Sequence, residues 1–162
     1  MKRVLLLAMM SAVILPFAAR AQSKPDFSGT WTLDTAKSDP APQGRGGRGG
    51  GGGAASLTIK QTASELAISS EGRQGPQTLT YKLDGSESTN QVMGRGGATP
   101  VKSTVKWDGA SLVVETTRDM QGMSVTTREV RRLDSSGKEM QVETTAQTPN
   151  GEVKRKTVYT KS

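Results

Sequence analysis

Short runs of alternating polar and apolar residues recur between residue 29 and the end of the chain. A period of two is typical of strands that bury one face, and Val, Ile and Thr are frequent in these runs. The pattern predicts ten strands, at residues 29–33, 56–62, 65–70, 77–83, 86–92, 99–107, 111–118, 123–133, 138–147 and 152–160. No window after residue 21 shows helical periodicity.

Turn signals separate the predicted strands. Asp84-Gly85 is a two-residue hairpin signal, because a type I′ turn needs positive φ at both positions. Asp108-Gly109, Asp134–Gly137 and Asn150-Gly151 act similarly. Short connections between consecutive strands predict an all-β fold, an up-and-down antiparallel β-barrel of about 8–10 strands that closes to eliminate its edges.

One stretch, residues 34–55, departs from the pattern. It holds eight of the chain's 19 glycines, all between Gly44 and Gly53, together with Arg45 and Arg48. Such a composition cannot bury enough apolar surface to offset its ordering entropy. We therefore expect a flexible Gly/Arg-rich loop after the first strand.

The alternation also assigns an inward face, on which hydroxyl groups lie among the apolar residues. These hydroxyl residues are Ser103, Thr116, Thr127, Thr144 and Thr157. The whole chain has only two Trp, two Tyr and two Phe, which is thin filling for ten strands. An underfilled barrel predicts a cavity, and the alternative is a flattened, collapsed barrel that binds nothing.

The first 21 residues have the pattern of a secretory signal peptide. Lys2 and Arg3 precede an apolar run at 4–17, and Ala19-Arg20-Ala21 supplies an A-x-A cleavage pattern. Export to the periplasm or the outside of the cell is predicted, with residues 22–162 as a single domain. Cleavage would leave 19 basic against 15 acidic residues and lower the net charge from +7 to +4. The mature chain is then only mildly basic.

Histidine and cysteine are both absent. This excludes Ser-His-Asp and Cys-His catalysis, disulfides and the usual His or Cys metal sites, so we expect no metal and no cofactor. Among acidic candidates, alternation turns Glu115 and Glu143 outward, and Glu129 shares a face with Arg131, which indicates a buried or half-buried ion pair. The sequence predicts no enzyme and no catalytic residue.

The segment Phe27-Ser28-Gly29-Thr30-Trp31-Thr32-Leu33 resembles the opening F-x-G-x-W-x-L of the calycins, the lipocalins and fatty-acid-binding proteins. The resemblance implies that Trp31 plugs one end of the barrel. Residues 156–161 are similar to the last strand of fatty-acid-binding proteins, and Trp107-Asp108-Gly109 is similar to their hairpins. The segment Tyr81–Gly85 resembles small exported bacterial lipocalin-like proteins.

The chain also departs from that family. Fatty-acid-binding proteins have two helices where this chain has residues 34–55. Their last strand carries an Arg-x-Tyr pair that holds the ligand carboxylate, and the matching positions here are Thr157 and Tyr159. Arg155 shares the face of this pair and could hold a carboxylate bidentately, or it belongs to a solvated charge run. The predicted ligand-binding residues are Tyr81, Ser103, Thr127, Arg155 and Tyr159.

Four arginines fall in connections that the strand count places at one rim. The connections are residues 34–55, 71–76 and 93–98, and the arginines are Arg45, Arg48, Arg73 and Arg95. Our hypothesis is a cationic mouth that draws in anionic ligands or rests against an anionic envelope surface. The alternative is a solubilising loop with no specific role. No aromatic residue is interleaved with these glycines and arginines for base stacking, so we expect no nucleic-acid partner.

Two functions follow from these patterns. The first is non-catalytic binding of a small hydrophobic or amphipathic ligand, anionic or not, inside a lipocalin-like barrel of a monomeric exported protein. The alternative is an envelope or protein interaction module that uses the arginine-rich rim loops and has the barrel as its scaffold.

Overall fold

A computed structural model describes residues 24–40, 53–72, 75–94, 97–120, 123–148 and 151–162. The predicted signal peptide lies outside the described residues, as do Arg45, Arg48, Arg73 and Arg95, so the cationic rim stays a prediction. No described residue belongs to a helix that could cross a membrane.

Ten antiparallel strands form one sheet, as the alternation predicts. They are β1 (Gly29–Leu33), β2 (Ser56–Gln61), β3 (Glu65–Gly72), β4 (Gly75–Lys82), β5 (Ser88–Gly94), β6 (Gly97–Asp108), β7 (Ser111–Met120), β8 (Met123–Leu133), β9 (Glu139–Thr148) and β10 (Gly151–Lys161). Every predicted limit lies within two residues of these. The all-β prediction is confirmed.

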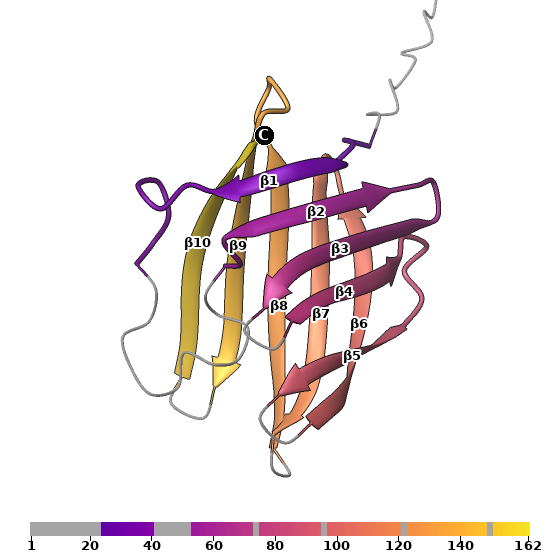
Figure 1. The fold of residues 1–162 in the computed structure, drawn as a ribbon. Helices are drawn as coiled ribbons and strands as arrows, with labels where there is room; N and C mark the ends of the chain where they lie inside the picture. The colour runs from indigo at the N-terminus through magenta and orange to yellow at the C-terminus, as the bar shows by residue number, and fades with distance from the viewer. Residues whose placement is uncertain (1–23, 41–52, 73–74, 95–96, 121–122, 149–150) are drawn as a thin grey trace, which may run out of the picture.

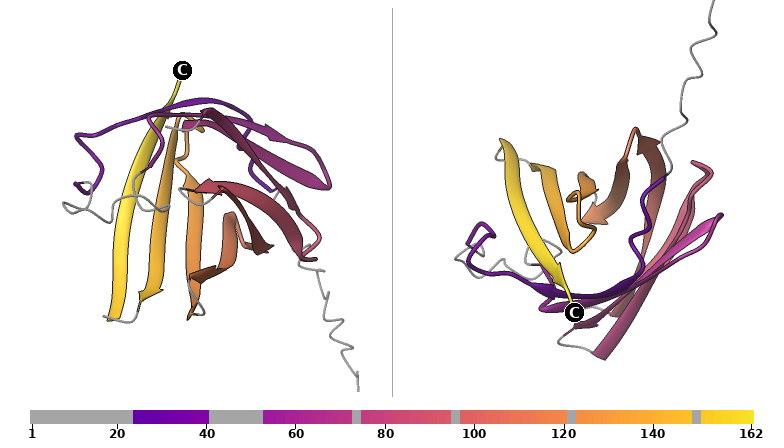
Figure 2. Two further views of the ribbon diagram at one scale, coloured as in Figure 1. Left: turned by 60° about the horizontal axis from the view of Figure 1, so that its bottom comes forward. Right: turned by 90° about the horizontal axis from the view of Figure 1, so that it is seen from above.

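The sheet curls into a nearly closed barrel (Figures 1 and 2). Its strand order is β4-β3-β2-β1-β10-β9-β8-β7-β6-β5, so the first strand pairs with the last. Trp31 lies opposite Lys161, and Leu33 lies opposite Tyr159. In Figure 1 the strands β1–β5 cross in front of β6–β10 at a steep angle. Strands β2–β4 therefore stand across the interior from β7–β9.

The predicted hairpin at Asp84-Gly85 is wrong. The turn itself forms, with Gly85 at φ +88° and the Ser86 amide donating to the Asp84 carboxylate at 2.9 Å. The strands that it joins, however, are the two ends of the sheet order and share no backbone ladder. A turn signal reports local backbone conformation, whereas pairing depends on the angle at which the two strands leave the turn.

Side chains bridge the seam between β4 and β5. The Asn90 amide behaves like a short piece of backbone, since its Oδ1 accepts from the Thr80 amide at 2.8 Å and its Nδ2 donates to the Thr80 carbonyl at 3.0 Å. Next to it the Ser88 hydroxyl accepts from the Lys82 amide at 2.9 Å. These bonds satisfy part of an edge that would otherwise be open.

Two predicted loops, at 71–76 and 93–98, are partly strand. Pairing continues to Glu71 opposite Pro76, to Gly72 opposite Gly75, and to Gly94 opposite Gly97. Gly and Pro interrupt the alternation there, which hides the strand ends in the sequence, but the neighbouring backbone still provides partners.

Aromatic residues fill the end of the barrel where the chain enters β1. Phe27 and Trp31 are fully buried, and the Trp31 indole donates to the Phe27 carbonyl at 2.9 Å. The Phe27 ring lies 6.2 Å from that of Trp107. Gln61 ties the entering chain down, because its side chain accepts from the Phe27 amide and donates to the Pro25 carbonyl, both at 3.0 Å. We call this end the closed end.

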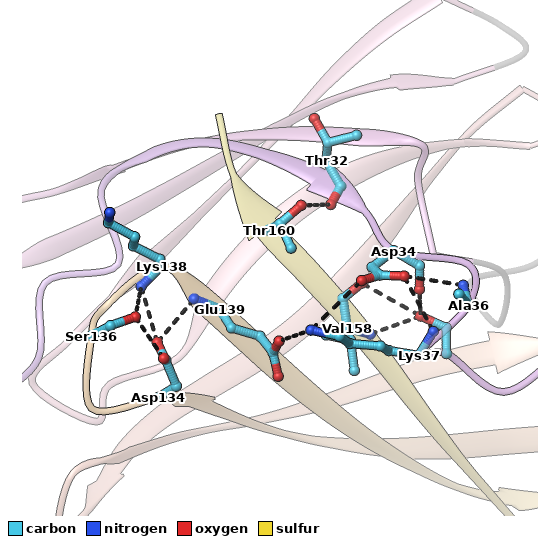
Figure 3. A network of polar contacts seen from close by, with 11 residues as sticks. Thr32, Asp34, Ala36, Lys37, Asp134, Ser136, Lys138, Glu139, Val158 and Thr160 are labelled. Atoms are coloured by element: carbon cyan, nitrogen blue, oxygen red, sulfur yellow. Dashed lines mark hydrogen bonds and ion pairs between the residues drawn. The ribbon is translucent and has the colours of Figure 1, made fainter.

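Beyond β1 the chain stays against the outer edge of β10. The Asp34 amide donates to the Val158 carbonyl at 2.8 Å, and the Ser38 hydroxyl accepts from the Val158 amide at 2.9 Å. Figure 3 shows this contact beside the β8–β9 turn, where the Asp134 carboxylate accepts the Glu139 amide at 2.9 Å. Lys37 forms an ion pair with Glu139 and so connects the segment after β1 to the β8–β9 turn. Val158 is buried in consequence, although its side chain points outward.

Loss of the Asn90 amide should loosen the seam. We expect Asn90→Ala to lower the free energy of unfolding by about 0.5–1.5 kcal/mol, because two partly exposed hydrogen bonds are lost. The Thr80 amide should exchange its hydrogen faster, which NMR-detected exchange measures. Thr89→Ala, on the outward face of the same strand, should leave that amide unchanged. Equal exchange rates in both variants would contradict the bridging role.

Candidate functional site

The interior differs along its depth. Near the closed end Val105, Leu112 and Met140 are all 0% exposed, and the partly buried Leu33, Trp107 and Leu133 pack against the same core. Towards the opposite rim, which we call the open end, the inward residues keep part of their surface accessible. These residues are Asn90, Thr116, Arg118, Val125, Thr127, Thr144 and Ala146. The exposure of the inward residues therefore increases from this closed half of the barrel towards the open half, although Val101 and Ser103 on β6 stay buried there.

Arg131 lies where these two halves meet. It points inward from β8, opposite Leu112 on β7 and Val142 on β9, and is only 8% exposed. Its Nη2 donates to the Glu129 carboxylate at 2.5 Å. The Nε and Nη1 atoms are buried and have no hydrogen-bond partner among the described residues. The sequence predicts an ion pair between these two residues. It does not predict that Nε and Nη1 of Arg131 are left without a described partner.

Two tyrosines face this ion pair. Tyr81 on β4 is 5% exposed and Tyr159 on β10 is 4% exposed. Burial, with Glu129 adding to it, raises the pKa of Tyr81 to about 12. Burial likewise raises the pKa of Tyr159, against the nearby charge of Arg131. For Arg131 itself, burial acts to lower the pKa, but Glu129 together with Tyr81 and Tyr159 outweighs it and the pKa is raised. Both phenols and the guanidinium therefore keep their protons at neutral pH.

Two further arginines face the open half. Arg155 lies on the inward face of β10, in a cross-strand row with Thr144 and Glu129. Its Nη2 donates to the Asp39 carbonyl at 3.3 Å, while its Nε and Nη1 are buried without a described partner. Arg118 on β7 lies near enough to Tyr81 to act on its pKa. The described inward residues of the open half thus include three arginines and one carboxylate, that of Glu129, which makes the site cationic.

The structure places all five predicted ligand-binding residues on the inward face. Ser103 is 2% exposed and Thr127 is half-buried. Arg155 and Tyr159 lie on the same face of β10, with Thr157 between them. Their role in binding stays a prediction, as does that of Trp31, which lies buried at the closed end. Arg131 is missing from the predicted set, although its spacing of two from Leu133 marked it as inward.

Two predicted orientations can be compared with the exposure of the side chains. Glu115 and Glu143 point outward, with side chains 51% and 47% exposed, as expected. Val153, which the alternation turns inward, is 53% exposed. Its place near the open end of β10 explains the difference, because β1 pairs only with the other end of that strand.

The last residue of the glycine run approaches the site closely. A Cβ on Gly53 would lie 2.5 Å from the Tyr159 hydroxyl oxygen and 2.9 Å from the Thr157 methyl carbon. Ala54, next in the chain, packs against the buried core. The chain thus returns to β2 across the Tyr159 side chain, and only glycine leaves room for that phenol.

The raised pKa of Tyr81 should make the stability of the fold depend on pH in the alkaline range. Its pKa is about 12 in the folded protein, against 10.0 for an ordinary tyrosine, so only the folded state keeps the proton between these pH values. Stability from this group is complete below pH 10 and falls as the pH rises through 12. Between pH 9.5 and pH 11.5, the free energy of unfolding in urea should fall by about 2 kcal/mol more in the wild type than in Tyr81→Phe. Equal losses would contradict the burial of the phenol.

Gly53→Ala should destabilise the protein by about 1–3 kcal/mol through overpacking against Tyr159. Removal of the hydroxyl by Tyr159→Phe should relieve part of this, so the double variant should be at least about 0.5 kcal/mol more stable than additivity predicts. Urea unfolding of the four proteins measures this difference. Additive effects would show that the close approach does not hold in solution.

Comparisons with known proteins identify the fold. No protein-family model and no curated protein sequence matches the chain. Among solved structures, zebrafish ileal bile acid-binding protein complexed with cholic acid is 15% identical with a TM-score of 0.60, covering 84% of this chain and 98% of that one. Echinococcus granulosus fatty-acid-binding protein 1 is 16% identical, with a TM-score of 0.54 over 83% and 96%. Human cRBP IV is 17% identical, with a TM-score of 0.52 over 85% and 99%. The fold is therefore the calycin-like barrel that the opening motif resembles.

Proposed function

We propose that this protein binds a small amphipathic anion, without catalysis, in the open half of its barrel. The observation that carries the proposal is the buried Arg131 guanidinium, whose Nε and Nη1 have no partner among the described residues. A guanidinium stays charged in proteins, so it cannot relieve its burial by losing a proton. A carboxylate or similar group of the ligand would accept a charge-assisted hydrogen bond from one of these two donors.

The surroundings of Arg131 support an amphipathic ligand. Glu129 neutralises one arginine only, and Arg118 and Arg155 leave the site with excess positive charge. The apolar core begins directly beside Arg131, at Leu112 and Val142. An anionic group at the guanidinium would therefore have apolar surface within reach of the rest of the molecule.

Proteins of similar fold point the same way. One neighbour holds cholic acid, and another is named a fatty-acid-binding protein. Both names concern small molecules with an apolar body and a carboxylate. The likeness is in fold, so the argument for this chain rests on Arg131 and its unused donors.

We place this function in the periplasm or outside the cell, as a monomer. The support is the signal-peptide pattern of residues 1–21. The chain also lacks cysteine, so an oxidising compartment would form no disulfide in it.

Neutralising each partner of the ion pair should change affinity in opposite directions. We expect Arg131→Gln to weaken dodecanoate binding about tenfold or more, because a charged hydrogen-bonding partner is lost. Glu129→Gln should strengthen binding several-fold, since it frees Arg131 from its counter-ion. Isothermal titration calorimetry of the mature protein, residues 22–162, measures both effects.

The outer ion pair of Arg132 and Glu143 on β8 and β9, 3.2 Å long, offers a matched control. Arg132→Gln should leave dodecanoate affinity unchanged. The double variant Glu129→Gln/Arg131→Gln, which leaves no buried charge unpaired, should keep its melting temperature and still bind weakly. Unchanged dodecanoate affinity in Arg131→Gln would show that Arg131 does not bind the anionic group of the ligand. A wild-type protein that binds neither dodecanoate nor anilinonaphthalene sulfonate would favour the interaction-module alternative.

A further inference from the structure

The anchor of the proposed function is covered by its described neighbours. Arg131 is 8% exposed, and Tyr81 and Tyr159, which face it, are 5% and 4% exposed. The two unused donors of Arg131 are themselves buried. The half-buried residues of the open end lead towards the guanidinium but do not expose these atoms. A ligand therefore contacts Arg131 only after part of the surrounding wall has moved.

The seam between β4 and β5 is the weakest part of that wall. All neighbours in the strand order are joined by backbone ladders, whereas β4 and β5 stand at its two ends. Besides the two bonds of Asn90 and the one of Ser88, the Gln77 side chain donates to the Gln91 carbonyl at 3.1 Å. Three of these four side-chain bonds are exposed. Water competes for exposed donors and acceptors, so the seam opens at less cost than a ladder does.

The seam is fixed at one end only. At the closed end the Asp84-Gly85 turn joins the two strands, and the Leu83 amide next to it donates to the Ser64 carbonyl at 2.8 Å. Along the rest of their length β4 is held by its ladder with β3, and β5 by its ladder with β6. The pairs β3–β4 and β5–β6 are thus two units that can part from each other about the turn.

Opening of the seam uncovers the ionic site. Thr80 and Lys82, whose amides donate across the seam, are the neighbours of Tyr81 on β4. Successive residues of a strand point to opposite faces, so Tyr81 projects inward from the strand that borders the seam. Beyond burial, the charges of Glu129 and Arg131 act on its pKa, so the phenol lies near the ion pair. When β4 moves away from β5, Tyr81 therefore moves away from Arg131.

We propose that the seam between β4 and β5 is a side gate through which the anionic group of the ligand reaches Arg131. The strands part about the Asp84-Gly85 turn, the ligand enters between them, and the seam bonds re-form behind it. This inference rests on the proposed function and adds its route of entry. A tenth backbone ladder would close the barrel more firmly and leave no comparable place to open.

Stopped-flow fluorescence of anilinonaphthalene sulfonate with the mature protein, residues 22–162, measures entry. In the wild type the observed rate should level off as the probe concentration rises, because seam opening then limits it. Asn90→Ala removes two seam bonds and should raise this plateau about three- to tenfold. Displacement of the probe by excess dodecanoate should accelerate by a similar factor. The equilibrium affinity should stay within about twofold, because the free and the bound protein lose the same bonds.

A second variant and a matched control accompany this test. Gln77→Ala removes a single seam bond and should act in the same direction by a smaller factor. Gln61→Ala is the control, since its side chain also bonds one backbone amide and one carbonyl, those of Phe27 and Pro25, but at the closed end. It should lower the free energy of unfolding about as much as Asn90→Ala does and change neither rate.

Equal rates in the wild type and Asn90→Ala would overturn the gate and show that ligands enter at the open end. Equal acceleration by Gln61→Ala would overturn it too, because general loosening of the barrel would then explain the rates. Either result leaves the proposed function intact. A wild type that binds neither anilinonaphthalene sulfonate nor dodecanoate would overturn both the gate and the proposed function.

Discussion

The interior of this protein depends on the backbone pairing of its first strand with its last. A ten-stranded sheet left open would expose two long edges and let water reach its inner face. The contacts of Trp31 with Lys161 and of Leu33 with Tyr159 close one side, and the Asn90 amide bridges the other. Only this closure turns the period-two face of each strand into an inside. The burial of Arg131, the raised pKa of Tyr81 and the cationic character of the site all follow from it.

Packing and function occupy different depths of the barrel. The closed half holds the aromatic plug and the fully buried aliphatic residues, which supply most of the hydrophobic stabilisation. The open half has threonines and arginines at inward positions where aliphatic residues would pack better. Buried arginine donors without partners are unfavourable for folding alone, so the closed half must stabilise a site that the described residues leave unsatisfied.

Much of the candidate site could be predicted from period-two alternation, because inward residues are defined by strand face alone. Tyr81, Ser103, Thr127, Arg155 and Tyr159 all lie inward for that reason. Alternation cannot say which strands face one another across the barrel. The sequence therefore pairs Arg131 with Glu129, two residues away, but does not show that Tyr81 approaches them from β4. The Asp84-Gly85 error has the same origin, since a local signal was used to predict a non-local pairing.

The sequence by itself determined the all-β class, the ten strands, their inward faces and the absence of histidine and cysteine chemistry. These depend on local periodicity and composition, which each short segment carries alone. The tertiary structure decided where the sheet closes, where its seam lies, which wall opposes which, and that Gly53 returns against Tyr159. These depend on the angle and twist at which distant strands meet, which no single segment encodes. The unused donors of Arg131 belong to this second group, because hydrogen-bond satisfaction is known only when every neighbour is in place.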